Sequence, residues 1–188
     1  YERASVLARS APDVYVSQAA RWVMVLEVVA AQGRPAEAEL EQVLRWAGKA
    51  AEADPDSSGA LQAVARAHWR LAEHYQRSGG DPAPPLLESI AASERILKAH
   101  PDDSSSHFQL GSAFSRLAEV RLSRGQDPDV DFARALDHLS RSLELEPGHP
   151  ITLNNLGLAH WRRGMYRLGL GQDPTPDLEQ AADAFHRA

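Results

Sequence analysis

The sequence predicts an all-α protein made of helical hairpins that stack on one another. The first observation is a period of 46 residues, which separates one series of glycines and, independently, one series of prolines. The second is that the segments between these marks carry apolar residues at helical spacing, without the alternation typical of strands. A hairpin with one apolar stripe per helix cannot bury it alone, so the copies must stack. The two series are Gly33, Gly79, Gly125 and Gly171, and Pro55, Pro101 and Pro147.

The period divides the chain into repeats within one predicted domain, residues 1–188. The repeats cover 11–54, 55–100, 101–146 and 147–188, and residues 1–10 are expected to form a preceding helix. The first repeat is expected to be a shortened copy from Val14 to Asp54, because Pro12 and Pro55 are only 43 residues apart.

Each repeat contains two amphipathic segments joined by a glycine turn. In the first segment of the second repeat, Leu61, Val64, Ala65, His68 and Ala72 follow the i, i+3, i+4, i+7, i+11 course of one helix face. The second segments behave in the same way. The turns of the last three repeats read Gly-x-Asp-Pro, which predicts a helix end followed by a capped helix start. The first turn is Gly33-Arg34-Pro35. A single carboxylate per turn is too few for calcium, so we interpret the turn aspartates as caps. They are Asp81, Asp127 and Asp173.

These residues resemble the tetratricopeptide repeat. The first helix of that family carries a Leu-Gly pair, here Leu110-Gly111 and Leu156-Gly157, and its second helix carries small residues before a proline, here Ala135 and Pro147. The resemblance implies a right-handed solenoid whose first helices line a concave face. The usual repeat has about 34 residues, so both helices are expected to be longer here. The Gly-x-Asp-Pro turn is also similar to repeats that follow the catalytic domain of some bacterial serine/threonine kinases.

Composition excludes several classes of function. A formal charge of −6 argues against nucleic-acid binding. The absence of cysteine excludes disulfides and sulfur-based zinc sites. Val23–Ala31 is interrupted by Glu27, so no membrane insertion is expected. No catalytic motif is present, and we expect neither an enzyme nor a cofactor or metal. His68 and His160 are interpreted as fillers of an aromatic position between helices. We expect a cytoplasmic location.

The resemblance places one set of first-helix residues on the concave face. Arg70, Arg116 and Arg162 are 46 residues apart and could form a ladder for acidic groups, beside Trp69 and Trp161 for an apolar side chain. The alternative is that Arg70 and Arg116 pair with Glu73 and Glu119 in their own helices. The predicted partner-binding residues are Gln62, Arg66, Trp69, Arg70, Phe108, Ser112, Arg116, Asn154, Asn155, Leu158, Trp161 and Arg162.

The predicted function is a protein-interaction module that takes a peptide or a partner helix in this concave groove. Only Asn154 and Asn155 match the family's clamp for a terminal carboxylate, so that activity is not expected. One alternative is a self-associating scaffold, because Val16, Val23 and Met24 place apolar groups where the groove is expected. The other is a non-catalytic regulatory region of a bacterial serine/threonine kinase.

Overall fold

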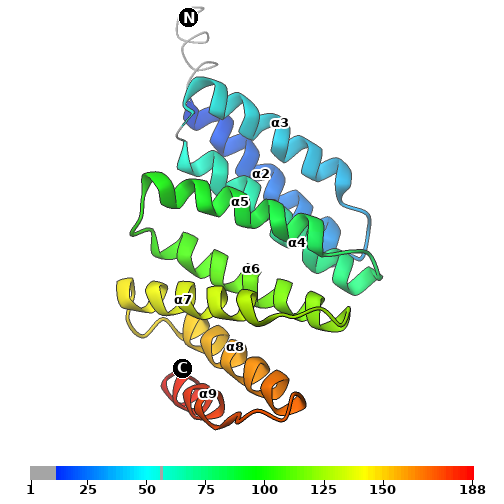
Figure 1. Cartoon of the computed structure of the whole chain (residues 1–188). Coiled ribbons are helices and arrows are strands. Elements are labelled where there is room, and N and C mark those ends of the chain that lie inside the picture. Colours follow the sequence, from blue (N-terminus) through cyan, green and yellow to red (C-terminus); the bar gives the residue numbers. More distant parts are fainter. Residues whose placement is uncertain (1–11, 56) are drawn as a thin grey trace, which may run out of the picture. The chain divides into compact units, whose positions relative to one another are not determined.

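The computed structural model describes residues 12–55 and 57–188. The described residues form eight α-helices and no strand (Figure 1). The helix expected over residues 1–10 lies outside them. The chain divides into two compact units, Tyr1–Ala99 and His100–Ala188. The prediction of a single domain over 1–188 therefore stays a prediction.

Each unit holds two helical hairpins. In the first unit, α2 (Pro12–Ala31) pairs with α3 (Glu37–Ala53), and α4 (Ser58–Ser78) pairs with α5 (Ala83–Ala99). In addition, α4 packs against both α2 and α3. In the second unit, α6 (Ser104–Ser123) pairs with α7 (Asp129–Leu145), and α8 (Pro150–Gly169) pairs with α9 (Thr175–Arg187). There α8 packs against α7 and touches α6.

The backbone conformation of the turns repeats with the 46-residue period. Gly33, Gly79, Gly125 and Gly171 end the first helix of each hairpin with φ of 71°, 83°, 68° and 71°, a left-handed conformation that glycine adopts without steric cost. In the last three turns the aspartate accepts a hydrogen bond from the first backbone N–H of the next helix. The distances are 2.9 Å from Asp81 Oδ1 to Ala83 N, 3.0 Å from Asp127 Oδ1 to Asp129 N, and 3.0 Å from Asp173 Oδ1 to Thr175 N. The aspartates thus satisfy a backbone N–H at each helix start, as a cap does. In the last two turns, however, the N-cap residue is the proline, Pro128 or Pro174, and not the first helical residue as expected.

The expectation of a shortened first repeat is wrong. Helix α3 runs from Glu37 to Ala53, and both ends lie one period before those of α5. Helix α2 has 20 residues, as do α6 and α8. The error came from aligning Pro12 with Pro55, whereas the position one period before Pro55 is Arg9.

The core of the first unit joins both of its hairpins. Val23 and Leu26 of α2, Val43 of α3, and Ala67 and Leu71 of α4 are buried in one cluster. Many of the other core residues are alanines, which allow the helices to approach closely. In the second unit, Leu136 and Leu139 of α7 pack with Ala159 of α8.

Glycine marks the crossing of the two helices in each hairpin of the second unit. A Cβ at Gly111 would lie 2.5 Å from Leu139 Cγ and 3.0 Å from the Ala135 carbonyl oxygen. A Cβ at Gly157 would lie 2.6 Å from the Phe185 ring. The Leu-Gly pair in the sequence therefore reflects a direct helix–helix contact, since no larger residue fits without displacement.

Helix α2 differs from the other first helices in its hydropathy. Its mean hydropathy of 1.3 over 18 residues makes it long and apolar enough to cross a membrane, although Val23–Ala31 alone is too short. In the structure, however, Val23, Leu26 and Ala30 are buried against the rest of the first unit. The other side of α2 is exposed.

Candidate partner-binding surface

Ion pairs connect the first helices of the first unit. Arg66 Nε and Arg70 Nε of α4 donate to Glu27 Oε1 of α2 at 2.8 and 3.1 Å. Arg70 also donates from Nη1 to Glu73 Oε2 in its own helix at 2.8 Å. Burial alone would raise the pKa of Glu27, but the hydrogen bonds from Arg66 and Arg70 outweigh it and lower that pKa. Arg70 thus joins the two hairpins through their carboxylates.

The same arrangement recurs in the second unit. Arg116 Nη1 donates to Glu119 Oε2 at 2.9 Å within α6. Arg162 of α8 forms an ion pair with Glu119 of the preceding hairpin. The alternative that Arg70 and Arg116 pair with Glu73 and Glu119 is confirmed. Both arginines therefore already have an internal carboxylate partner, which offsets part of their positive charge.

We call six of these residues, all but Arg66, the charge ladder. Its glutamates, Glu27, Glu73 and Glu119, are 46 residues apart, like its arginines Arg70, Arg116 and Arg162. The two positions that would continue the series are Met24 in α2, in the arginine register, and Met165 in α8, in the glutamate register. They are the only methionines of the chain. Met24 is 64% exposed and Met165 is 45% exposed.

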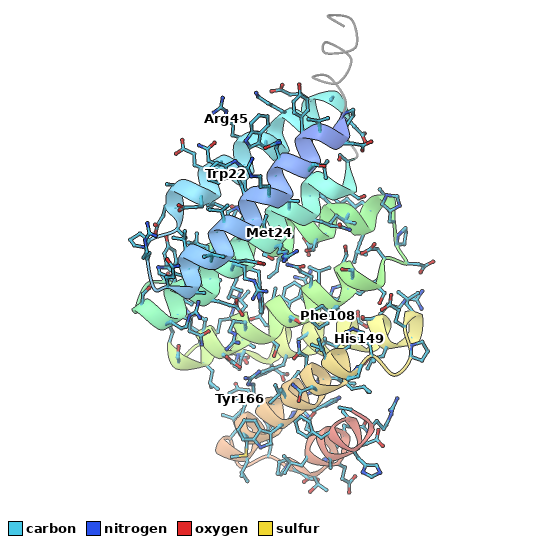
Figure 2. The ribbon with its side chains drawn as sticks, turned by 180° about the vertical axis from the view of Figure 1, so that it is seen from behind. Trp22, Met24, Arg45, Phe108, His149 and Tyr166 are labelled. Atoms are coloured by element: carbon cyan, nitrogen blue, oxygen red, sulfur yellow. The ribbon has the colours of Figure 1, made fainter. Side chains whose placement is uncertain are left out.

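The remaining predicted residues have different environments. Ser112 is buried, and its hydroxyl accepts a hydrogen bond from Asn155 Nδ2 at 3.0 Å. Phe108 packs edge-on against His149 at 6.2 Å between ring centroids (Figure 2). These contacts hold α6 and α8 in place. Gln62 and Asn154 are exposed, whereas Trp69 and Leu158 are half-buried. That these residues bind a partner stays a prediction.

A pocket lies beside the charge ladder in the second unit. It has a volume of about 510 Å³ and is bounded by the C-terminal halves of α6 and α8 and the start of α7. Its polar groups already have partners, because Arg162 pairs with Glu119 and the Tyr166 hydroxyl donates to Asp127 Oδ1 at 3.1 Å. The rest of the pocket lining is apolar, which suits an apolar side chain of a ligand. The apolar lining residues are Leu122, Phe132, Trp161, Met165 and Leu170.

Of the predicted residues, Trp161 and Arg162 line this pocket. Trp161 is 47% exposed and stands free at its rim. The sequence analysis did not predict Leu122, Met165 or Leu170. The amphipathic pattern of α8 contained a signal for Met165, because Trp161 and Met165 are four residues apart and lie on one helix face.

A buried carboxylate also escaped the sequence analysis. Asp177 of α9 is 1% exposed and accepts hydrogen bonds from His160 Nδ1, Arg163 Nε and Arg167 Nη1 at 3.0, 2.9 and 2.9 Å. Burial would raise the pKa of Asp177, but the hydrogen bonds of Arg163 and His160 lower it. Burial in turn lowers the pKa of His160. All these groups belong to α8 and α9, so the cluster fastens that hairpin.

No protein-family model matches the chain, and no curated protein is similar enough to match it. Solved structures do match. A structure named MamA RS-1 ArsTM double mutant has a TM-score of 0.56 and 16% identity, over 97% of this chain and 78% of that one. Together with the periodic hairpins and their close glycine crossings, this likeness decides the fold.

The fold is tetratricopeptide-like.

Two other solved structures are less similar. One is named MamA MSR-1 C2, with a TM-score of 0.49 and 15% identity over 93% of this chain and 94% of that one. The other is named YrrB, a TPR protein with an unusual peptide-binding site, with a TM-score of 0.38 and 15% identity over 97% of this chain and 91% of that one. The kinase-associated hypothesis stays unconfirmed. For this tetratricopeptide-like chain, the candidate site is the first-helix surface of each unit.

Proposed function

We propose that this chain is a protein-interaction module whose second unit binds an apolar side chain of a peptide or partner helix in the pocket beside Trp161. The pocket carries the proposal. Its volume of about 510 Å³ falls within the range of about 300–1,000 Å³ typical of ligand sites. Aromatic side chains at such sites often supply a large share of the binding energy.

The chemistry of the lining favours an apolar anchor over an acidic one. Arg162 and Arg116 both pair with Glu119, so part of their charge is already neutralised and an incoming carboxylate would gain less from them. Arg66 and Arg70 share Glu27 in the same way in the first unit. An acidic partner, as first predicted, would therefore gain little from the charge ladder. Polar groups of the partner would contact only the solvent-exposed side of the charge ladder.

The proposal gives the pocket a binding role and no catalytic one. The pocket offers no nucleophile beside a base, and its titratable side chains Glu119, Arg162 and Tyr166 are engaged in ion pairs or hydrogen bonds. Tetratricopeptide-like folds are commonly recognition surfaces, and that is an argument by analogy.

A selection of peptides tests the proposal. A phage-displayed library of random peptides would be selected on the immobilised chain, and the enriched peptides would be measured by isothermal titration calorimetry. We expect them to share a large apolar residue and to lose at least tenfold in affinity with Leu122→Glu, which places a charge in the pocket lining.

The matched control is Leu87→Glu, which changes an exposed leucine of α5 that does not line the pocket. Affinity for the same peptides should stay unchanged. Enriched peptides that bind Leu122→Glu as well as the natural chain would refute the pocket as their site. Circular dichroism would confirm that both variants keep their helicity.

A further inference from the structure

Helix α2 exposes an apolar face at positions that the next first helix buries. Val14, Met24, Val25 and Val28 are all exposed, with Val28 at 57%. One period later in α4, Ala60, Leu71 and His74 replace Val14, Val25 and Val28, and they are 3, 5 and 5% exposed. We call Val14, Met24, Val25 and Val28 the head face. Met24 is labelled on α2 in Figure 2.

The structure shows what covers these positions in α4. The hairpin of α2 and α3 does so, since Tyr75 Oη donates to Glu37 Oε1 at 2.9 Å and Arg70 Nε donates to Glu27 Oε1 at 3.1 Å. Val23, Ala30 and Ala47 of that hairpin are 1, 3 and 4% exposed in the core shared with α4. A head-type surface is thus covered by the surface of a preceding hairpin. This also explains why Val16 and Val23, expected in the groove, are instead half-buried and buried.

The last hairpin carries a matching surface that is exposed. Three periods after Val23, Ala30 and Ala47 stand Trp161, Leu168 and Phe185, which are 47, 51 and 40% exposed. Three periods after Glu27 stands Met165. We call Trp161, Met165, Leu168 and Phe185 the tail face. Its residues are larger than their counterparts and apolar throughout, as expected of a surface that packs against another.

Met24 of the head face and Met165 of the tail face occupy corresponding positions of the charge ladder. Within the chain, the arginine of one first helix pairs with the glutamate of the preceding first helix, as Arg70 does with Glu27 and Arg162 with Glu119. If a tail face received a head face in the same way, Met165 would take the place of the glutamate and Met24 that of the arginine. Methionine replaces both the arginine and the glutamate, so neither face would bring an unpaired charge into the contact between head face and tail face, which we call the joint. Removing only one would be costly.

We propose that copies of this chain associate head to tail, with the head face of one copy packed on the tail face of the next and Met24 against Met165. Methionine is flexible and polarizable and adapts well to such contacts. Because the head face and the tail face are different surfaces, the contact is heterologous and does not close at a dimer. A lipid surface could cover the head face of the apolar helix α2, but it would not account for the matching tail face.

Substitutions that copy the arginine–glutamate pair of the charge ladder test the proposed association. Met24→Arg and Met165→Glu each place a single charge in the proposed joint, whereas the double variant Met24→Arg/Met165→Glu recreates the internal arginine–glutamate pair. Sedimentation equilibrium over a range of protein concentrations would measure association. We expect an average mass that rises above the dimer for the natural chain, association weakened about tenfold or more in each single variant, and recovery in the double variant. Recovery should weaken at high salt.

Controls separate folding, lipid binding and pocket binding from association. The like-charged double variant Met24→Arg/Met165→Arg should stay dissociated, and thermal unfolding should be unchanged in all variants because both methionines are exposed. Trp161 and Met165 of the tail face also line the pocket, so a neighbouring copy and a peptide would compete there. Met24 does not line the pocket, so Met24→Arg changes the joint and leaves the pocket lining itself unaltered. A natural chain that stays monomeric at several hundred micromolar overturns the proposal. So does association that the single variants leave intact, or binding of α2 to phosphatidylcholine vesicles that Met24→Arg abolishes without self-association.

Discussion

Glu27 of α2 accepts hydrogen bonds from both Arg66 and Arg70 of α4, two residues that lie one turn apart on the neighbouring helix. One carboxylate therefore bridges two hairpins of the first unit. The side chain of Glu27 is only 24% exposed, which shields these pairs from solvent more than is usual for ion pairs at a protein surface.

Replacement of Glu27 by glutamine should destabilise the first unit. We expect a loss of about 1 kcal/mol in the free energy of unfolding, because the two arginines are partly exposed and regain hydration. Urea unfolding followed by circular dichroism measures it, and the difference should shrink at 1 M salt. Glu41→Gln on the exposed side of α3 is the control, and an equal loss there would contradict the assignment.

Asp177→Asn should be much more damaging, because it leaves three cationic or donor groups around a buried amide. Breaking a buried pair typically costs about 3–5 kcal/mol, and partial solvation of Arg167 reduces this to about 2–4 kcal/mol here. Thermal unfolding of the variant would show it. Asp183→Asn, which removes the exposed pair with Arg187, should change stability by less than about 0.5 kcal/mol.

Stability should fall as the pH drops from about 7 to about 5. Burial lowers the pKa values of His68 and His160 in the folded chain, so the unfolded chain takes up protons first, below its ordinary pKa of about 6.5. Because the unfolded state binds more protons in this window, protonation favours unfolding. The lowered pKa values of Glu27 and Asp177 act only below about pH 4.5.

The variant His68→Phe isolates one part of this effect. Phenylalanine occupies the same position one repeat later, at Phe114, and is buried there. The variant should lose less stability between pH 7 and pH 5 than the natural chain, as measured by urea unfolding at both values. An identical slope for the two chains would show that His68 is not a source of the pH dependence.

Three glycines offer a graded test of helix crossing. Gly111→Ala should cost about 2 kcal/mol, because its Cβ would meet Leu139 and backbone oxygen. Gly157→Ala should cost less, because Phe185 is 40% exposed and can move aside. Gly48→Ala, where no atom lies within 4 Å, should stabilise α3 by about 0.5–1 kcal/mol. Any other order of the three melting temperatures would contradict the packing described.

The sequence was informative wherever the period itself specified local structure. Gly79 and Asp81 predicted a left-handed turn and a cap because both effects arise within a few residues, and the spacing of Leu136 and Leu139 predicted a buried helix face. The pairing of Arg70 with Glu73 could be foreseen because three residues separate them on one helix.

Contacts between hairpins were harder to predict. The pairing of Arg162 with Glu119 requires knowledge of which helices pack together, although the equal spacing of Glu27, Glu73 and Glu119 was a signal that went unused. Asp177 was missed because an aspartate near a helix start is ordinarily an exposed cap. The pocket could not be predicted at all, since it is the volume that Leu122, Trp161 and Met165 leave unfilled, and this depends on their exact directions.

The packing of each helix on its immediate neighbours has a consequence for how the chain folds. The extensive contacts in each unit join helices that are adjacent or next but one in the sequence, such as α2 with α3 and with α4. Little chain entropy is spent on closing such short loops, so folding is expected to be fast. Unfolding of one hairpin also destabilises only the helices that pack directly against it, which permits partial opening of a unit. Amide hydrogen exchange should accordingly report a stepwise gradient of protection within each unit instead of a single value.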